Sequence, residues 1–353
     1  MSDPKAPVLR IRWQLQYTRC NLKCPYCIAA WTERPVDFDA ERFNRIADKL
    51  MEAPYRLVVR LGVEGEIFLS SDILDGVVRL SHHPRTEGVS FSTNLVVPWK
   101  RIEPFLDRVD ASRLGMGVTL HDTQIDDIDG FFDKVKRVHD RGALVFVGYV
   151  ALPDRFPQIR EYKARLDDMG VPFILNEYNG AMESRPYPAA YTAEDRAFLR
   201  EHFWSEHYYD MLVERKNPRG RHCLAGYRYI YIGKDGTMLP CGMEKNREWN
   251  LLQRILRRFN PKWPERIQER RISRRSPGNI LEDGLLLRDG PRICPHSRCD
   301  CGNEVQAMEH VGKDYHRTRT LRIIYPKDRA DDLAARFPTL RPVPDDSESL
   351  PRK

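Results

Sequence analysis

The sequence predicts an α/β protein with a partial barrel of six parallel strands, followed by a small cysteine-rich domain. The barrel is predicted by a regular alternation of strand-like and helix-like stretches through the first half of the chain. The second domain is predicted by the cysteines, because five of the eight lie beyond residue 222. At 353 residues the chain is long enough for one large and one small domain.

The strand and helix stretches are defined by their apolar spacing and by their end residues. The stretch 39–53 begins at an Asp and has apolar residues at helical spacing, and Gly142 is placed to end another helix. Right-handed crossovers would curl six such units into an open barrel, with the functional site at the carboxyl ends of the strands. The expected strands are 8–17, 55–62, 89–94, 113–120, 143–152 and 171–178, and the expected helices are 39–53, 71–82, 99–109, 127–142 and 157–169.

The chain divides into four parts. Residues 1–180 form the barrel, and 181–222 form a linker with a helix near 193–202. Residues 223–318 form the cysteine-rich domain, which opens with two strands joined at a Lys-Asp-Gly turn. Residues 319–353 form an extension whose polar, Pro-rich end is expected to be disordered.

Composition places the protein in the cytoplasm. The N-terminus has no basic-then-apolar signal pattern, and no apolar run approaches the ~18 residues that span a bilayer. Clustered cysteines in such a chain indicate metal ligands in a reducing compartment and not disulfides.

Three cysteines near the N-terminus carry the strongest chemical signal. Cys20, Cys24 and Cys27 have the spacing C-x3-C-x2-C, and no histidine lies within fifty residues on either side. A structural zinc site takes four ligands in a closed tetrahedron, whereas three thiolates suit an iron–sulfur cubane with one open iron. A zinc knuckle and a redox cysteine cluster are the alternatives to this interpretation.

The triplet resembles the signature of the radical S-adenosylmethionine enzymes, in which an aromatic residue precedes the last cysteine, as Tyr26 does here. The resemblance implies a partial (β/α)6 barrel and a [4Fe–4S] cluster held by Cys20, Cys24 and Cys27. The open iron would chelate the methionine part of S-adenosylmethionine. Reductive cleavage would give a 5′-deoxyadenosyl radical that takes hydrogen from a substrate.

Further cofactor contacts follow from the resemblance. Gly65 and Glu66 follow the second expected strand, where these enzymes carry a Gly-Gly-Glu-Pro-like motif, although Glu64 and Ile67 replace its first Gly and its Pro. Glu66 and its neighbouring backbone would hold the methionine amino group. The remaining expected cofactor contacts are the Tyr26 backbone, Ser92, Asn94 and Thr119.

Several residues near strand ends are candidates for contact with the substrate. His121 follows the fourth strand and could bind substrate or move a proton, or cap the next helical region. Tyr149 of the fifth strand is expected on the same rim, as are Asn176, Glu177 and Tyr178 at the end of the sixth. Polar residues at strand ends are also often structural.

The C-terminal cysteines resemble the SPASM and twitch extensions of this family. Cys223 and Cys241 flank Gly236 as C-x12-G-x4-C, and Cys294, Cys299 and Cys301 follow as C-x4-C-x-C. The resemblance implies one auxiliary [4Fe–4S] cluster, with Cys223, Cys241 and two of the other three as ligands. A zinc ribbon is the alternative.

A basic stretch interrupts this second domain. The net charge of the chain is +7, and residues 245–275 hold eleven Lys or Arg against three Glu. The stretch could contact an anionic substrate, a nucleic acid or an acidic electron donor such as flavodoxin or ferredoxin. An amphipathic helix pair with solvated arginines is the structural alternative.

The sequence therefore predicts a radical S-adenosylmethionine enzyme with one auxiliary cluster that oxidises or otherwise modifies a small metabolite or sugar. The first alternative is an enzyme that modifies ribosomally made peptides. Only seven residues precede the first strand, so a leader-binding domain is then expected on a separate protein. The second alternative is a non-catalytic zinc protein that binds nucleic acid.

Overall fold

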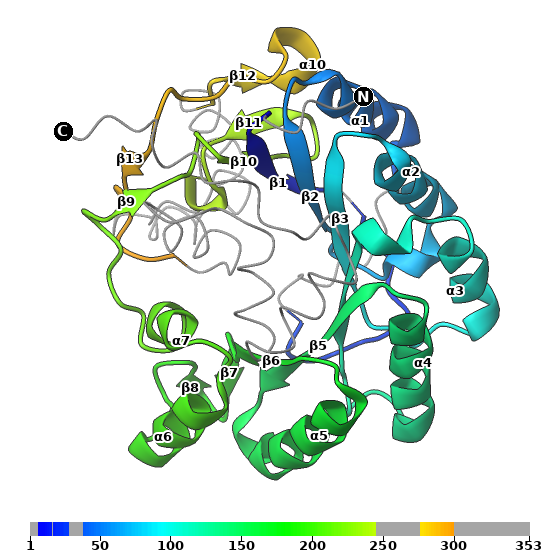
Figure 1. The fold of residues 1–353 in the computed structure, drawn as a ribbon. Helices are drawn as coiled ribbons and strands as arrows, with labels where there is room; N and C mark the ends of the chain where they lie inside the picture. The colour runs from blue at the N-terminus through cyan, green and yellow to red at the C-terminus, as the bar shows by residue number, and fades with distance from the viewer. Residues whose placement is uncertain (1–5, 16, 28–37, 245–275, 300–353) are drawn as a thin grey trace, which may run out of the picture.

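The computed structural model describes residues 6–15, 17–27, 38–244 and 276–299. Its first half is a βα repeat in which six parallel strands lie in sequence order, each joined to the next through a helix (Figure 1). The strands are β1 (Val8–Gln14), β2 (Arg56–Gly62), β3 (Thr86–Thr93), β4 (Leu114–Thr119), β5 (Leu144–Ala151) and β6 (Phe173–Glu177). The helices are α1 (Ala40–Glu52), α2 (Ser71–His82), α3 (Trp99–Leu106), α4 (Ile128–Asp140) and α5 (Phe156–Met169), with short 3₁₀ turns η1 (Ile67–Leu69), η2 (Ala111–Arg113) and η3 (Pro153–Arg155).

The expected helices form because their ends are capped. Asp39 accepts a hydrogen bond from the Arg42 amide, and Asp127 accepts one from the Gly130 amide at the start of α4. Gly170 ends α5 with φ 69°, a left-handed conformation that glycine adopts at little cost. The six strands, the five helices and their order agree with the sequence prediction.

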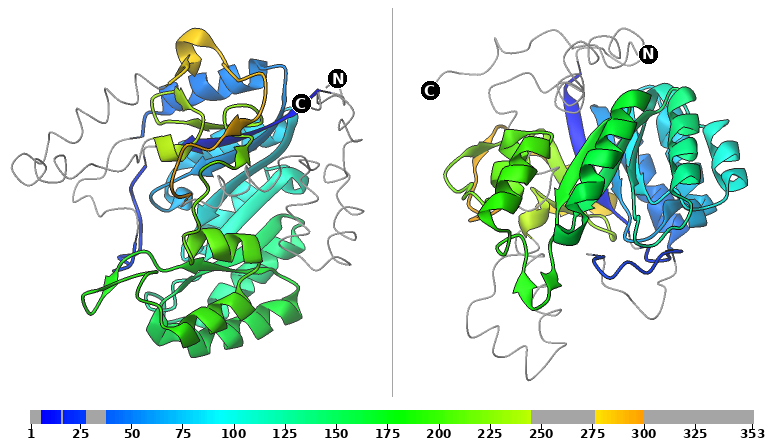
Figure 2. Two further views of the ribbon diagram at one scale, coloured as in Figure 1. Left: turned by 90° about the vertical axis from the view of Figure 1, so that its left-hand side faces the viewer. Right: turned by 90° about the horizontal axis from the view of Figure 1, so that it is seen from below.

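The two faces of the sheet differ in chemistry. In β1, Leu9, Ile11 and Trp13 are buried, whereas the alternating residues Arg10 and Arg12 are only half-buried. The apolar face packs under α1–α5, where the Trp13 ring stacks on Phe43 at 4.6 Å between centroids. Seen from below, helices lie along the outer side of the strands (Figure 2, right). The inner face is therefore polar, although most parallel sheets are apolar on both faces.

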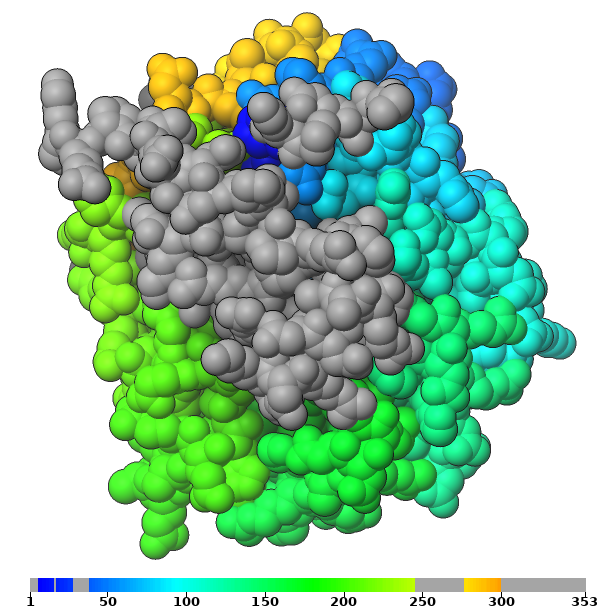
Figure 3. Space-filling view, in the orientation of Figure 1, coloured from blue at the N-terminus to red at the C-terminus, as the bar shows by residue number. Residues whose placement is uncertain are grey.

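The remaining elements follow the barrel along the chain. In the space-filling view, the described chain passes from the blue and cyan segments of β1–α3 to the green segments of α4–α7 (Figure 3). These elements are β7 (Ala181–Met182), β8 (Arg185–Pro186), α6 (Ala193–His202), α7 (Glu206–Leu212), β9 (His222–Cys223), β10 (Tyr229–Ile232), β11 (Thr237–Leu239), η4 (Gly242–Glu244), β12 (Gly278–Asn279), α10 (Ile280–Asp283) and β13 (Arg292–Ile293).

The hairpin expected after Cys223 is present but does not form a sheet of its own. β10 and β11 are antiparallel and turn at Gly236, which has φ 88°. β10 also pairs in parallel with β1, so β10, β11 and β12 extend the barrel sheet to nine strands. The cysteine-rich region is thus continuous with the barrel through main-chain hydrogen bonds.

Several sequence predictions concern residues outside the described ranges. They are the predictions for the basic stretch 245–275, for Cys301 and for the end of the chain. Within the described part of the chain, no helix is long and apolar enough to cross a membrane.

Gly76 of α2 provides a test of the helix layer. A Cβ atom at this position would lie 2.0 Å from Cε1 of Phe43, the ring that stacks on Trp13. Gly76→Ala should therefore lower the free energy of unfolding by about 1–3 kcal/mol, despite the better helix propensity of Ala. Chemical denaturation measures the change. Gly290→Ala is the matched control, because a Cβ there meets no atom within 4 Å, and an equal effect in both variants would contradict this packing.

Candidate active site

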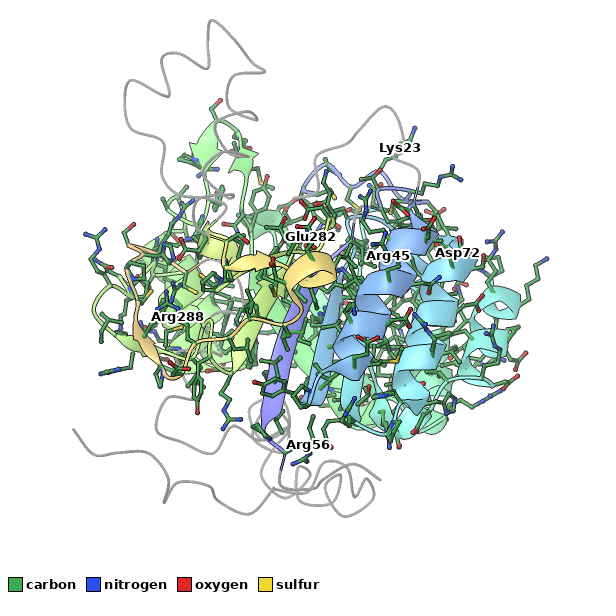
Figure 4. All side chains as sticks on the ribbon, turned by 90° about the horizontal axis from the view of Figure 1, so that it is seen from above. Lys23, Arg45, Arg56, Asp72, Glu282 and Arg288 are labelled. Atoms are coloured by element: carbon green, nitrogen blue, oxygen red, sulfur yellow. The ribbon has the colours of Figure 1, made fainter. Side chains whose placement is uncertain are left out.

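The cysteine loop lies at the carboxyl edge of the parallel sheet, directly after β1. Lys23 from this loop and Arg56 at the start of β2 lie at opposite ends of the sheet (Figure 4). Cys24 is buried at 5% exposure, whereas Cys20 and Cys27 are exposed. The Cys27 amide donates to the Cys24 carbonyl oxygen at 3.1 Å, so the loop turns tightly between these two cysteines.

The three thiols influence one another electrostatically. Burial, together with the charges of Cys27 and Cys20, raises the pKa of Cys24 to about 11. Burial also raises the pKa of Cys20, with Glu66 and Cys27 adding to the effect. A metal cation between the three sulfur atoms would offset the repulsion between their thiolate forms. The donor set therefore fits a metal cluster with three cysteine ligands.

The loop after β2 is joined to the segment around the cysteine loop by backbone hydrogen bonds. The Glu66 amide donates to the Arg19 carbonyl oxygen at 2.8 Å, and the Glu64 amide donates to the Tyr17 carbonyl oxygen at 3.1 Å. A Cβ at Gly65 would lie 2.1 Å from the same Arg19 oxygen. Only glycine permits this approach of the two backbones.

The Glu66 carboxylate joins this loop to the end of β3. Its Oε1 accepts from the Phe68 amide at 3.0 Å and from Thr93 Oγ1 at 2.7 Å, and its Oε2 accepts from the Asn94 amide at 2.7 Å. Glu66 is 1% exposed. Burial raises the pKa of this carboxyl, while the three hydrogen bonds favour its ionised form. The side chain is thus an acceptor that orders the loop.

Asn94 links the end of β3 to the cysteine loop. Its Nδ2 lies 3.7 Å from Cys20 Sγ and donates to Asn21 Oδ1 at 2.8 Å. The next residue, Leu95, is fully buried with φ 56°. A left-handed backbone costs a non-glycine residue about 1–2 kcal/mol. Strain is therefore stored where Asn94 meets the cysteine loop.

His121 lies against the cysteine loop as well. Its Nδ1 is 3.0 Å from the Tyr26 hydroxyl and 3.3 Å from Cys24 Sγ, and the Tyr26 and His121 rings stack. Burial lowers the pKa of His121 to about 4, so the imidazole is neutral at pH 7. Thr123 Oγ1 donates to the Tyr26 hydroxyl at 3.4 Å. His121 can therefore exchange a hydrogen bond with either the thiol or the phenol.

Ser92 and Thr119 lie on the inner face of the barrel. Ser92 Oγ accepts a hydrogen bond from Arg60 Nη2. Thr119 is the last residue of β4 and pairs with Gly148 of β5. A Cβ atom on Gly148 would lie 3.9 Å from Thr119 Oγ1, and it would lie 3.2 Å from Asn176 Nδ2. Both residues thus face the interior below the cysteine loop.

By the alternation of side chains along β5 and β6, Tyr149 and Glu177 belong to the outer face, and Glu177 is the last residue of β6 at the carboxyl edge. The Tyr149 hydroxyl donates to Asp122 Oδ2 at 2.8 Å, and its ring packs edge-to-face on Tyr162 of α5. Glu177 is buried and accepts from Asn179 Nδ2 at 2.6 Å. Side chains alternate along a strand, so these two odd-numbered positions point away from the interior, where the even-numbered residues lie.

The inner face carries further polar residues. Asn176 of β6, which the sequence predicts on the rim, is exposed, and Arg12 and Arg60, which the sequence prediction missed, are half-buried on β1 and β2. Asn21 of the cysteine loop was also missed. Alternation along β1 and β2 would have placed Arg12 and Arg60 on one face.

The C-terminal cysteines form a second buried group. β13 pairs with β9 so that Arg292 lies opposite Cys223, and the Cys294 amide donates to the Arg221 carbonyl oxygen at 2.8 Å. This register places Cys223 and Cys294 diagonally on one face of the pair, a spacing of about 7–8 Å between Cα atoms. The four described cysteines of this region, each 4–6% exposed, are Cys223, Cys241, Cys294 and Cys299.

Cys241 lies within a charged hydrogen-bond network. Arg292 donates from Nη2 to Cys241 Sγ at 3.2 Å and from Nη1 to Glu244 Oε1 at 2.9 Å. His296 Nε2 is 3.6 Å from the same sulfur. Burial would raise the pKa of Glu244, but hydrogen bonds from His296 and Arg292 lower it to about 2. A buried sulfur that accepts a hydrogen bond from a guanidinium group fits a thiolate ligand that is hydrogen-bonded around its metal.

Comparisons with known proteins support the fold. No protein-family model matches the chain, and no curated protein matches it in sequence. Streptococcus suis SuiB bound to the precursor peptide SuiA shares 15% identity at a TM-score of 0.50, covering 80% of this chain and 65% of that chain. Native anSMEcpe with bound AdoMet and Cp18Cys peptide shares 12% identity at a TM-score of 0.51, covering 79% of each chain.

These structures confirm the expected fold. The chain spans less than two thirds of the length of SuiB. SuiB and anSMEcpe are radical S-adenosylmethionine enzymes, and this chain has their partial barrel fold. At identities of 12–15% the likeness concerns the fold and not the substrate.

Gly65→Ala tests the anchoring of the cysteine loop. The added methyl group collides with the Arg19 backbone and should displace the loop, so the iron bound after anaerobic reconstitution should fall by about four per chain. An iron assay with circular dichroism measures both metal content and folding. Gly290→Ala is again the control, and full iron content in Gly65→Ala would contradict the proposed role of this close approach.

Tyr149→Phe tests the outward position of Tyr149. Loss of its hydrogen bond to half-buried Asp122 should lower the free energy of unfolding by about 1–2 kcal/mol, with no change in iron content. Chemical denaturation of the variant measures this. Tyr55→Phe is the control, because no hydrogen bond is found for the Tyr55 hydroxyl among the described residues. Unchanged stability with lost iron would place Tyr149 in the metal site instead.

Proposed function

We propose that this protein is a radical S-adenosylmethionine enzyme with one auxiliary iron–sulfur cluster. The observation that carries this proposal is the position of the C-x3-C-x2-C loop. It lies at the carboxyl edge of the barrel, and the Gly65–Glu66 loop and Asn94 hold it there. The alternative interpretations, a zinc knuckle or a redox cluster, do not account for this arrangement on this fold.

Cys20, Cys24 and Cys27 would hold the first cluster. When bound, the cluster and S-adenosylmethionine would supply reductive cleavage of the cofactor and a 5′-deoxyadenosyl radical that abstracts hydrogen from the substrate. The Glu66 carboxylate is occupied by hydrogen bonds from its own loop and from β3. The contact to the methionine amino group would therefore come from the backbone beside Gly65, with the Tyr26 backbone and Asn94 nearby.

The interior side chains would contact the cofactor and the substrate. Ser92 and Thr119 point into the barrel below the cysteine loop and are placed for the ribose or the substrate. His121 would act on the metal-binding loop through Cys24 and Tyr26, as a neutral group that can accept or donate one proton. Tyr149 and Glu177 have no proposed catalytic role because they face outward.

The second buried cysteine group would hold the auxiliary cluster. Cys223, Cys241, Cys294 and Cys299 are the described candidates, and Cys301 is the fifth. This cluster would anchor the substrate or accept an electron from it. The β10–β11 hairpin, which Cys241 follows, joins the barrel sheet through the pairing of β10 with β1, whereas Cys223 and Cys294 belong to the separate β9–β13 pair.

The first candidate for the substrate is a small metabolite or a sugar, and the second is a peptide. The solved structures support the second candidate, since SuiB is bound to the precursor peptide SuiA and anSMEcpe to the Cp18Cys peptide. The electron donor would be a flavodoxin or ferredoxin, for which the basic stretch 245–275 is a candidate contact. A cytoplasmic location would suit these partners.

Anaerobic reconstitution of paired variants tests this function. The wild-type chain should bind about eight irons, and reduction with S-adenosylmethionine should release 5′-deoxyadenosine and methionine. Cys24→Ser should bind about four irons and release neither product, whereas Cys223→Ser should bind about four irons through loss of the other site. Each variant is thus a control for the other, and iron assay with chromatography of the products gives the readout.

Stoichiometric zinc in the wild-type protein, with no cleavage of S-adenosylmethionine after reconstitution, would contradict this proposal and favour the zinc-binding alternative.

A further inference from the structure

Arg292 places a positive charge within the second cysteine group. It lies on β13 opposite Cys223 of β9, so these two side chains share one face of the strand pair. Cys294 follows two residues later on that face. Arg292 Nη2 also donates to Cys241 Sγ at 3.2 Å. Arg292 is therefore a neighbour of three of the four described cysteines of this group.

The guanidinium group of Arg292 is buried with its partners. The Arg292 side chain is 9% exposed, as is that of Glu244, whose Oε1 accepts from Nη1 at 2.9 Å. Burial would lower the pKa of Arg292, but the neighbouring Cys241 and Glu244 raise it above its ordinary value, so the group stays cationic. Its Nε is buried and has no hydrogen-bond partner among the described residues. A buried N–H without an acceptor is costly, so this donor fits a site that also takes a ligand.

The alternative to a cluster beside Arg292 is a single metal ion held by Cys241, Glu244 and His296, whose ligand atoms lie within 4.8 Å of one another. Arg292 argues against this ion. The Glu244 oxygen that lies 3.4 Å from His296 Nε2 is the same Oε1 that accepts from Arg292. A buried guanidinium would repel a metal cation bound at that oxygen. A cluster with thiolate ligands carries a net negative charge, so a cation beside one of its sulfur atoms stabilises it.

We infer that Arg292 raises the reduction potential of the auxiliary cluster through its hydrogen bond to Cys241, and that Glu244 moderates this effect. The inference rests on the proposed function and adds how its second cluster is tuned. One-electron reduction makes a cluster one charge more negative, so a cationic donor at a ligand sulfur stabilises the reduced form. The Glu244 carboxylate orients the guanidinium and offsets part of its charge.

A higher potential bears on one of the two roles proposed for the auxiliary cluster. After hydrogen abstraction, a substrate radical becomes a closed-shell product when it releases one electron and one proton. A cluster that is more easily reduced is a better acceptor for that electron. Arg292 would thus favour oxidation of the substrate.

Redox titration followed by electron paramagnetic resonance tests the inference. The parent is the reconstituted Cys24→Ser chain, in which the remaining cluster is the auxiliary one. Arg292→Gln should make reduction about tenfold less favourable, which is a fall of about 59 mV in a one-electron potential. Glu244→Gln keeps the guanidinium but removes its carboxylate partner, so it should shift the potential in the opposite direction. Arg292→Lys keeps the charge without the planar fork, and its potential should lie between those of the parent and Arg292→Gln.

The ion pair of Arg108 with Asp75 on α2 provides the matched controls. Its two side chains are joined at 2.7 Å, and both are more than half exposed. Arg108→Gln and Asp75→Asn should therefore leave the potential of the auxiliary cluster unchanged. An iron assay of every variant establishes that about four irons per chain are bound, so that loss of the cluster is distinguished from a shift in its potential.

An unchanged potential in Arg292→Gln would overturn the inference. So would shifts of the same sign in Arg292→Gln and Glu244→Gln, because a purely structural role would disturb the cluster alike in both variants. If Arg292→Gln takes up no iron, the signs of the shifts in Arg292→Lys and Glu244→Gln decide. A parent chain that binds zinc and no iron at the second cysteine group would instead overturn the auxiliary cluster of the proposed function.

Discussion

The Glu66 carboxylate holds the candidate active site together. Its two oxygens accept hydrogen bonds from the 3₁₀ turn after β2 and from the end of β3, and its amide donates to Arg19 of the cysteine loop. The cysteine loop, the turn after β2 and the end of β3 therefore meet at one buried residue, Glu66. An unmatched donor at this position would cost about 1–3 kcal/mol. The position of Cys20, Cys24 and Cys27 depends on this junction, as does the strained backbone at Leu95.

The two faces of the barrel sheet differ in polarity, and the proposed chemistry depends on the polar inner face. The outer face is apolar and packs under α1–α5, which provides the stability of the fold. The inner face keeps its arginine, serine and asparagine side chains at least partly accessible. The strained and polar groups gather at the carboxyl edge and inside the barrel, where the proposed chemistry takes place. The tyrosines around Asp122 belong to the outer layer and stabilise it.

Local patterns in the sequence were enough to predict the barrel, because capping residues and apolar periodicity define its helices and strands. The cysteine spacing likewise indicates the loop, and Glu66 and Asn94, which the sequence predicts as cofactor contacts, touch it. The pairing of β10 with β1 was not predicted, since it joins residues more than 200 positions apart. A prediction from strand ends alone does not say which face Tyr149 and Glu177 occupy, whereas the register of β5 and β6 puts both on the outer face. The contacts of His121 with Cys24 and Tyr26 depend on how two loops pack, which spacing does not encode.

Electron paramagnetic resonance of the reduced, reconstituted protein tests the central claim most directly. The measurement uses a Cys223→Ala, Cys241→Ala variant, so that the signal comes from the cluster of Cys20, Cys24 and Cys27 alone. The account predicts one [4Fe–4S] signal whose g-values shift when S-adenosylmethionine is added, because the cofactor binds the open iron. A signal that S-adenosylmethionine leaves unchanged, or a protein that takes up no iron at these cysteines, would contradict it.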